Sequence, residues 1–389
     1  MAQESLDEYL QYGSENNAEL QARFKEYQAA LEAIPQAKSL PDPLFSFGYF
    51  VSPVETRVGP QQAKFGLTQM LPWFGALNAR GSASEAMAQV KYENFIKARN
   101  SYFLKVRVNY FKLYEIQQGI RINIENLDIL RSWENLALKK YEGGLTGMVD
   151  VLRVQMTIAE LESSLQNQEK EFDNQSEVFN LLLNRDAGEK VNVDHQLLYP
   201  DMEYVISQDS LVNNPAFAIL SARKEVERKM IEVEQKNTMP NIGLGLDYVL
   251  VGPSTIDIPE SGKNVLMPMV SFSLPIYRKK NSSKIHEREL NLEALELYQN
   301  NLGNQLRSDL GTWINAYDDS KRDHLLYTEL IEKADQALRV LVTEYTSANK
   351  DFDEVLKMQQ LLLKYELALE KSIADRYISE AQLDYLFNR

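Results

Sequence analysis

The end of the chain repeats the end of its first half, and this internal repeat limits the fold more than any other feature. Residues 181–185 read Leu-Leu-Leu-Asn-Arg, and residues 385–389 read Tyr-Leu-Phe-Asn-Arg. The Asn-Asn pair at 16–17 likewise returns at 213–214. The copies are roughly 200 residues apart, which is too long for the unit of a solenoid. We expect a duplicated, domain-sized element, and the predicted repeats are residues 1–200 and 201–389.

The hydrophobic pattern changes its period within the first repeat. Helical spacing runs from residue 5 to 37, and we expect the prolines from Pro35 to Pro43 to end this helix. Alternation of apolar with small or polar residues then predicts a β-hairpin at 44–72. Helical spacing returns at 78–185, where a glycine-rich turn at 143–147 separates two long coiled-coil helices.

The second repeat shows the same order of periods. Its predicted elements are a helix at 214–235, a hairpin at 241–275 and long coiled-coil helices at 278–389. A helix of ~60 residues is a rod of about 90 Å, at 1.5 Å per residue. Such lengths are typical of coiled coils and helical barrels. The sequence therefore predicts a mainly α fold with a small β part, in which helix, hairpin, long helix and helix occur twice.

Each predicted strand has one apolar face and one small or polar face. One interpretation is a small antiparallel sheet that packs on helices with its polar face in water. The other is a segment of a membrane β-barrel, with its apolar face toward lipid and its polar face toward a lumen. Four strands cannot close alone, because the smallest membrane barrels need about eight, so this second interpretation requires a cyclic oligomer. The predicted lipid-facing residues are Phe45, Phe47, Tyr49, Phe65, Leu67, Ile242, Leu244, Leu246, Tyr248 and Phe272.

Composition excludes several classes of function. The chain contains no cysteine, which rules out disulfides, thiolate metal sites and cysteine nucleophiles. Its net charge of −14 argues against nucleic acid as a partner, because binding phosphates requires a basic face. No window has the roughly 20 apolar residues of a membrane-spanning helix. The first residues do not resemble a signal peptide, so we expect a cytoplasmic protein or one whose signal peptide is absent from this sequence.

No candidate enzyme site emerges from the sequence. The side chains considered for metal binding are His195, His286, His324, Met230, Met239, Met267 and Met269. The histidines lack metal-ligand spacing, and we expect them to pack or to lie on the surface. The methionines could handle a soft metal ion, but methionine more often fills gaps in a core. Neither a nucleophile–base grouping nor a phosphate-binding loop is visible, so we expect no enzymatic activity, no cofactor and no metal.

Together these landmarks resemble the TolC-like outer-membrane efflux protein family, the outer-membrane factors of tripartite pumps. The resemblance covers essentially the whole chain, from about residue 5 to 389. It depends on the order, spacing and duplication of short segments and not on any one of them. These segments are Asn-Asn-Ala-Glu-Leu (16–20), Pro-Asp-Pro-Leu-Phe-Ser-Phe (41–47), Leu-Pro-Trp-Phe-Gly (71–75), Tyr-Glu-Gly-Gly (141–144), Val-Asp-Val-Leu-Arg-Val-Gln (149–155), Asn-Asn-Pro (213–215), Pro-Asn-Ile-Gly-Leu (240–244) and Ser-Leu-Pro-Ile-Tyr (273–277).

The resemblance implies a homotrimer in the outer membrane of a Gram-negative bacterium. A trimeric 12-stranded membrane β-barrel, with four strands from each chain, would contact outer-membrane lipid and continue as a periplasmic α-helical barrel. The implied function is the exit duct of a tripartite efflux pump that exports small molecules. Its partners would be a periplasmic adaptor (membrane fusion) protein and an inner-membrane transporter of RND, ABC or MFS type. Alternatives are a type I protein secretion duct and, in a different class, a soluble coiled-coil interaction scaffold.

The resemblance also places a periplasmic entrance at two helix–turn–helix tips, residues 141–155 and 345–359. The second tip lacks the usual glycines, and Glu354 stands where the family has Asp; Asp351 and Asp353 could restore negative charge there. A ring of carboxylates would favour cations, whereas the alternative role of Asp150 and Glu354 is to stabilise the starts of helices. The implied gate and adaptor-contact residues are Tyr141, Gly144, Asp150, Arg153, Tyr345, Asp351, Asp353, Glu354 and Lys357.

Overall fold

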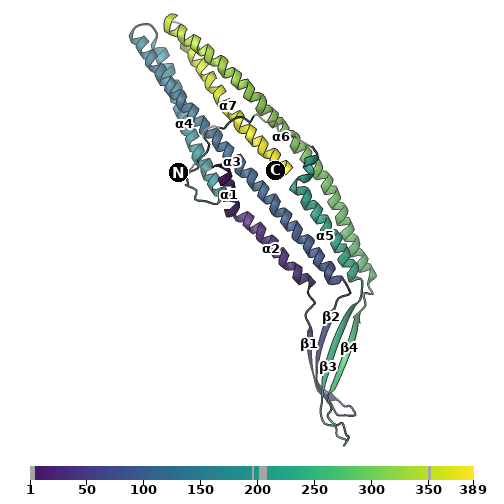
Figure 1. The fold of residues 1–389 in the computed structure, drawn as a ribbon. Helices are drawn as coiled ribbons and strands as arrows, with labels where there is room; N and C mark the ends of the chain where they lie inside the picture. Colours follow the sequence, from purple (N-terminus) through teal and green to yellow (C-terminus); the bar gives the residue numbers. More distant parts are fainter. Residues whose placement is uncertain (1–4, 195–196, 201–207, 349–351) are drawn as a thin grey trace. The chain divides into compact units, whose positions relative to one another are not determined.

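The computed structural model of the protein describes residues 5–194, 197–200, 208–348 and 352–389. Helices dominate, and the described strands form one small sheet (Figure 1). The elements in chain order are α1 (Leu6–Asn16), α2 (Ala18–Lys38), β1 (Leu44–Val54), β2 (Gln61–Leu71), α3 (Ala76–Glu142), α4 (Met148–Leu183), the 3-10 helix η1 (Gln208–Asn213), α5 (Pro215–Asn237), β3 (Asn241–Val251), β4 (Val265–Ser273), α6 (Arg278–Ala348) and α7 (Phe352–Phe387).

The predicted fold class is confirmed. Helix, hairpin, long helix and helix follow one another twice, and the long helices α3 and α6 have 67 and 71 residues. Both hairpins lie where the alternating pattern predicted them. Alternation places the apolar residues of a strand on one face, so the pattern identifies a half-exposed strand more clearly than a buried one.

The N-terminal helix differs from the prediction in two ways. It is interrupted at Asn17, whose extended backbone ends α1 and whose side-chain oxygen accepts the Leu20 amide hydrogen at 3.0 Å to cap α2. Pro35 does not end α2 but lies inside it, and the helix continues to Lys38. A proline inside a helix removes one backbone hydrogen bond and crowds the carbonyl four residues before it, and α2 nevertheless forms its last turn after Pro35.

The residues form two compact units. The helical unit consists of Met1–Ala22, Ile96–Pro215 and Leu302–Arg389, and the sheet unit consists of Arg23–Phe95 and Ala216–Asn301. Each unit therefore contains residues from both predicted repeats.

The sheet unit contains the antiparallel sheet, whose strand order is β1-β2-β3-β4. Pairing of β2 with β3 joins the two hairpins, which are distant in the sequence. Each strand is connected to one helix, and the helices follow the same order, α2-α3-α5-α6 (Figure 1). Ion pairs link α2 to α3 (Lys91 to Glu26, 3.0 Å) and α5 to α6 (Arg288 to Glu227, 3.3 Å), and Val233 of α5 packs on small residues of α3.

The helical unit has its largest apolar cluster where the ends of α3 and α6 meet the starts of α4 and α7. The buried members of this cluster are Leu127, Leu130, Val154, Ile158, Leu161, Ala334, Leu338, Tyr345, Phe352, Val355, Leu356 and Leu362. All four helices contribute residues to it, so the two predicted tips of one chain share a single core.

Both Asn-Arg landmarks end their helices with the same geometry. Asn184 and Asn388 have φ angles of 60° and 59°, in the left-handed region that asparagine tolerates better than most residues. The amide of Arg185 donates to the Asn180 carbonyl oxygen at 3.0 Å, and the amide of Arg389 donates to that of Asp384 at 2.9 Å. These are Schellman ends, which satisfy carbonyl groups that the last turn leaves free.

Candidate functional site

The turn of the first tip requires glycine at one position. Gly144 has a φ of +72° and follows the last turn of α3. Its amide donates to the Tyr141 carbonyl oxygen, and the Leu145 amide donates to that of Lys140, both at 2.9 Å. This is again a Schellman end, in which a residue with a side chain would be strained at the glycine position. Gly144 therefore sets the geometry of the turn, and Tyr141 contributes a backbone acceptor.

Asp150 lies in the first turn of α4 and is half-buried. Its carboxylate accepts a hydrogen bond from the Thr146 hydroxyl. It also lies close to Tyr345 of the second tip: burial raises the pKa of the Tyr345 hydroxyl, and the charge of Asp150 raises it further. Negative charge in the first turn of a helix is favourable, so Asp150 is well placed to stabilise the start of α4. The same position also brings its carboxylate close to Tyr345 of the second tip.

A buried lysine of the first tip covers the end of α6. Lys140 donates from its ammonium group to the carbonyl oxygen of Tyr345, in the last turn of α6, and lies 4.0 Å from the centroid of the Tyr345 ring. A cation at a helix C-terminus satisfies a free carbonyl group and favours the helix dipole. Lys140 thus satisfies a free carbonyl group at the end of α6, as the backbone amides of the Gly144 turn do at the end of α3. Asp351 lies outside the described residues.

The charged residues of the two tips pair with one another. Arg153 of α4 lies 3.5 Å from the Asp353 carboxylate of α7, and the ammonium of Lys357 lies 2.5 Å from the other oxygen of that carboxylate. The hydrogen bond from Lys357, with the charges of Lys357 and Arg153, lowers the pKa of Asp353. Two cations accompany this carboxylate, and the suggestion that Asp353 restores negative charge at the second tip stays a prediction. Glu354 is exposed.

Aromatic residues lie directly beneath the tips. The rings of Tyr345 and Phe352 are 4.6 Å apart between centroids, and Trp133 of α3 meets Phe352 edge-on at 6.2 Å. Tyr345 and Phe352 are 2% and 1% exposed. A change in the position of either tip would therefore repack this shared core.

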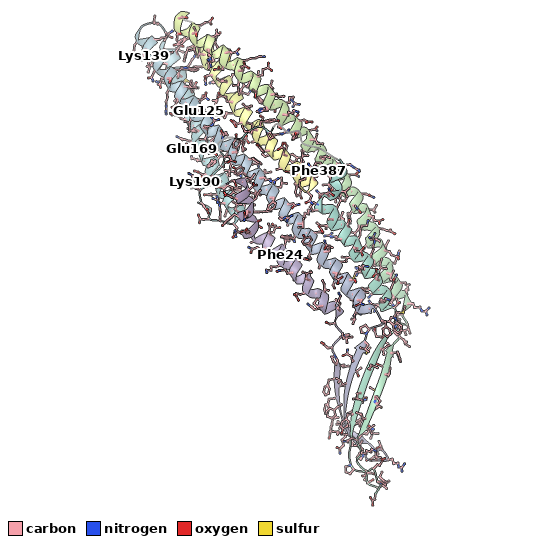
Figure 2. All side chains as sticks on the ribbon, viewed as in Figure 1. Phe24, Glu125, Lys139, Glu169, Lys190 and Phe387 are labelled. Carbon is pink, nitrogen blue, oxygen red and sulfur yellow. The ribbon has the colours of Figure 1, made fainter. Side chains whose placement is uncertain are left out.

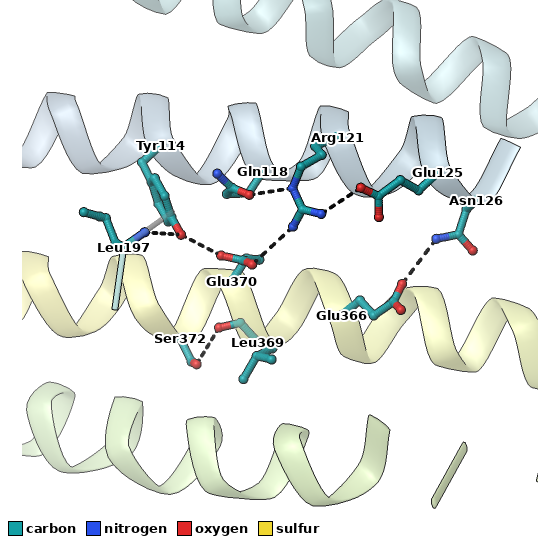
Figure 3. Close-up of polar contacts among 10 residues, drawn as sticks. All are labelled: Tyr114, Gln118, Arg121, Glu125, Asn126, Leu197, Glu366, Leu369, Glu370 and Ser372. Atoms are coloured by element: carbon teal, nitrogen blue, oxygen red, sulfur yellow. Dashed lines mark hydrogen bonds and ion pairs between the residues drawn. The ribbon is translucent and has the colours of Figure 1, made fainter. Parts of the chain in front are cut away.

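A polar seam between α3 and α7, which the sequence analysis missed, lies in the helical unit (Figure 3). The Arg121 guanidinium lies 2.9 Å from Glu125 of its own helix and 3.5 Å from Glu370 of α7. The Tyr114 hydroxyl donates to the same Glu370 carboxylate at 2.8 Å and accepts the backbone amide hydrogen of Leu197 at 3.2 Å.

Further along the seam, buried amides replace apolar contacts. Asn126 donates to Glu366 of α7 at 3.2 Å, and its oxygen accepts a hydrogen bond from Gln359. Asn126 and the neighbouring Asn123, which donates to Gln168 of α4 at 2.6 Å, are both 2% exposed. A signal was present in the sequence, because these residues precede the buried Leu127 and Leu130 by one helical turn and so share their face.

The ten predicted lipid-facing residues lie on one face of the sheet. Directly opposed residues of antiparallel strands point to the same side, and the register opposes Phe47 to Phe65, Phe65 to Tyr248, and Ile242 to Phe272. The rings of Phe47 and Phe65 are 5.1 Å apart. In the single chain, eight of the ten are at least 40% exposed, and this leaves a broad apolar face without cover.

The opposite face of the sheet carries small and charged residues. Lys64 of β2 forms an ion pair with Asp247 of β3, which is only 2% exposed. Gly66 makes room for this carboxylate, because a Cβ there would lie 2.7 Å from Asp247 Oδ1 and 2.5 Å from the Ser46 hydroxyl oxygen. The structure therefore has the small and polar face that the alternating sequence predicted, and the polar groups on this face are closely packed.

The histidines take part in local contacts. His286 lies 3.3 Å from Glu289, and His324 stacks on Tyr199 with 3.9 Å between ring centroids, while His195 lies outside the described residues. Within the described residues, no three histidine or carboxylate side chains gather in a way that could hold a metal ion. None of the described helices has an apolar stretch long enough to cross a bilayer.

A protein-family model matches most of the first half of the chain. Residues 10–185 match the model described as outer membrane efflux protein. This confirms the resemblance that the sequence landmarks carried. Comparison with curated protein sequences gives no match.

Solved structures share the fold over nearly the whole chain. The outer membrane protein VceC from Vibrio cholerae has a TM-score of 0.79 at 14% identity, covering 98% of this chain and 95% of its own. The open state of the MtrE outer membrane channel from Neisseria gonorrhoeae has a TM-score of 0.77 at 15% identity, and the match covers 98% of this chain and 88% of MtrE. The CmeC outer membrane channel from Campylobacter jejuni has a TM-score of 0.72 at 15% identity, and the match covers 99% of this chain and 86% of CmeC.

Proposed function

We propose that this chain, which belongs to the outer membrane efflux proteins through its match over residues 10–185, is one subunit of a trimeric exit duct. Proteins of this family work in tripartite pumps, generally as trimers. The specific partners expected for this chain are a periplasmic adaptor protein and an inner-membrane transporter. The proposed cargo is small molecules that leave the cell through the outer membrane.

The observation that carries the proposal is the uncovered apolar face of the sheet. Eight exposed aliphatic and aromatic side chains in one patch are unfavourable in water, whereas the same patch facing lipid is buried. Strands β1 and β4 lie at the edges of the described sheet and contain no charged residue that would oppose pairing with another strand. Three copies would supply 12 strands, which exceeds the minimum of about eight for a closed membrane barrel.

In this proposal the two tips form the periplasmic entrance of the duct. Their shared core and the contacts of Lys140 and Arg153 hold the tips of one chain together. Opening would separate or repack these contacts. Asp150 and the exposed Glu354 are the carboxylates proposed to influence cations there. We further propose that residues 1–200 and 201–389 are two copies of one structural element, because their Asn-Arg helix ends share the same geometry.

The test is the oligomeric mass of the detergent-solubilised protein, with single-channel recording of the same sample in a planar bilayer. The proposal expects a trimer that forms steady pores. A monomer that needs no detergent and forms no pores, even after refolding into lipid, would contradict the duct and favour the soluble scaffold. Export of a protein substrate instead of small molecules by a reconstituted system would favour the type I secretion duct.

A further inference from the structure

The strands of the sheet carry very little charge. Within the described strands the charged residues are Lys64 of β2 and Asp247 of β3, and β1 and β4 contain none. In the whole chain, by contrast, 25% of the residues are charged and the net charge is −14. The charge of these strands is therefore concentrated in two residues.

Both charged residues lie on the small, polar face of the sheet. Asp247 is directly opposite Gly66 in the register, and Lys64, two residues before Gly66, points to the same side. Phe65 and Leu246, which alternate with them along the strands, belong to the apolar face. Lys64 and Asp247 are thus diagonal neighbours on adjacent strands, and a long side chain such as lysine can span that distance.

The two charged side chains lie at different depths in this face. The Asp247 side chain is 3% exposed and occupies the space that Gly66 leaves, because a Cβ at Gly66 would be 2.7 Å from Asp247 Oδ1. The Lys64 side chain, which forms the ion pair with this carboxylate, is 39% exposed. Lys64 is opposite Gly48 of β1, where a Cβ would meet nothing within 4 Å, so the space beside the lysine is open. Solvent in front of this face therefore meets the ammonium group before the carboxylate.

The ion pair lies toward the end of the sheet that is remote from the helices. β2 begins at Gln61, directly after the loop that follows β1, and Lys64 comes three residues later, whereas α3 begins beyond the other end of β2. Asp247 lies in the half of β3 that leads away from α5. In the proposed duct this end of the sheet is the exit end of the barrel.

We propose that Lys64 and Asp247 set the charge preference of the exit: Lys64 of each copy contributes to a ring of ammonium groups that favours anionic cargo, and Asp247 limits this preference. The inference rests on the proposed trimeric duct, in which the polar face lines the lumen, and adds the charge class of the cargo. Three-fold symmetry places three Lys64 side chains at one level of the barrel.

The direction of the preference follows from the different depths of the two side chains. Rings of lysine or arginine side chains favour anions in pores, and substitutions that face the lumen of a membrane barrel tune its selectivity. Each buried carboxylate weakens the field of its own lysine. We therefore expect the parent channel to prefer anions only modestly.

The test is the reversal potential of the reconstituted channel under a gradient of potassium chloride, which gives the ratio of chloride to potassium permeability. Asp247→Asn keeps the shape of the buried side chain but leaves Lys64 uncompensated, so the ratio should move toward chloride by about twofold or more. Lys64→Met keeps the apolar stem but leaves Asp247 uncompensated, so the ratio should move toward potassium. The double variant Lys64→Met with Asp247→Asn has no charge on the strands and should lie between the two single variants.

The matched control is Lys263→Met, which removes the cation of another ion pair, that of Lys263 with Glu260 at 2.8 Å in the loop between β3 and β4. These side chains are 66% and 62% exposed, so salt and water screen them more strongly, and the shift should be smaller than that of Lys64→Met. An unchanged ratio in Asp247→Asn, a shift of the opposite sign, or an equal shift in Lys263→Met would overturn the proposed ring.

The native mass of each variant is measured with the currents. Lys64→Met leaves a buried carboxylate without its cation, which destabilises the fold. Asp247→Asn leaves only an exposed lysine, so it decides the question if Lys64→Met gives no channel. If the parent forms trimeric pores whose selectivity follows neither substitution, the ring is wrong while the duct stands. If the parent forms neither trimers nor pores, the proposed duct fails and the ring fails with it.

Discussion

The side-chain amide of Asn214 donates a hydrogen bond to the carbonyl oxygen of Leu386, 3.1 Å away, and Asn17 makes the corresponding bond to Leu182 at 3.5 Å. In each half, an asparagine just before a helix binds the end of that half's return helix. Asn214 is only 4% exposed. We expect Asn214→Ala to destabilise the protein by about 1–3 kcal/mol, because the Leu386 carbonyl loses a buried donor. Urea unfolding followed by helical circular dichroism measures this change.

The matched control is Asn300→Ala, at an exposed position of α6. It should change the free energy of unfolding by less than about 0.5 kcal/mol. Equal losses in the two variants would show that the bond to Leu386 contributes nothing specific.

Lys140→Met should loosen the end of α6. The substitution keeps the length and apolar stem of the side chain but removes the ammonium that binds the Tyr345 carbonyl oxygen. Hydrogen exchange of peptides covering residues 340–348 should accelerate several-fold, because local opening of that turn becomes easier. Lys139→Met, one residue away at an exposed position (Figure 2), is the control and should leave exchange unchanged. Unaltered exchange in both variants would remove Lys140 from the tip contact.

Gly66→Ala should impair the sheet, whereas Gly48→Ala should not. A Cβ at Gly66 would lie 2.5 Å from the Ser46 hydroxyl oxygen and 2.7 Å from Asp247 Oδ1, but a Cβ at Gly48 meets nothing within 4 Å. Overpacking of this kind costs about 1–3 kcal/mol. The readout is the yield of the proposed trimer that resists heat and detergent, and Gly48→Ala should match the parent protein. A full yield from Gly66→Ala would show that the crowded face can relax.

Glu366→Gln should stabilise the protein at neutral pH and lose this effect in acid. Burial raises the pKa of Glu366, so the folded state binds a proton more readily than the unfolded chain does. The ionised carboxylate therefore weakens the fold at pH 7, and this penalty disappears as the pH falls through the raised pKa toward the ordinary range of about 4.3. We expect Tm to rise by about 1–2 °C at pH 7–8 and to be unchanged near pH 4.

The exposed Glu160→Gln on α4 is the control for Glu366→Gln and should leave Tm unchanged at both pH values. A gain in Glu366→Gln that is as large in acid as at neutral pH would rule out titration of Glu366 as its cause.

The double variant Asp150→Ala with Glu354→Ala should change how strongly cations block the reconstituted channel, or how well the channel conducts cations. Both residues are placed at the tips, and removing carboxylates from a pore weakens its attraction for cations. Glu160→Ala with Glu169→Ala, at exposed positions further along α4, is a charge-matched control. If currents of the tip variant equal those of the parent at every cation concentration, the gate role of both residues is lost and the helix-start role remains.

The strands were predictable because each hairpin is half-exposed. Phe45 and Phe47 alternate with Ser46 and Gly48, and this alternation survives in the structure as two distinct faces. The break at Asn17 was not foreseen, because helical spacing continues across it and only its side-chain cap to Leu20 marks it. Pro35 was misjudged because proline usually breaks a helix, whereas α2 continues past it for one further turn to Lys38.

The tip contacts could be predicted only in part. Gly144 and Asp150 were placed correctly at a turn and a helix start by local signals. The contacts of Lys140 with Tyr345 and of Arg153 with Asp353 join residues about 200 positions apart, and no local pattern reports which ends meet. The buried amides of Asn123 and Asn126, which bond to α4 and α7, were overlooked because polar residues are expected at the surface, although buried ones are tolerated when they are hydrogen-bonded.

The uncovered sheet face has a consequence for biogenesis. A newly made subunit carries its apolar patch and its two open strand edges on the same four strands, and this combination favours aggregation in any aqueous compartment. Folding of these strands and association of subunits are therefore expected to be one event, with a stability that depends on subunit concentration. For the proposed trimer, the rate at which three copies meet at the membrane, relative to the rate at which chaperones or proteases capture a lone copy, would then set how many ducts a cell holds.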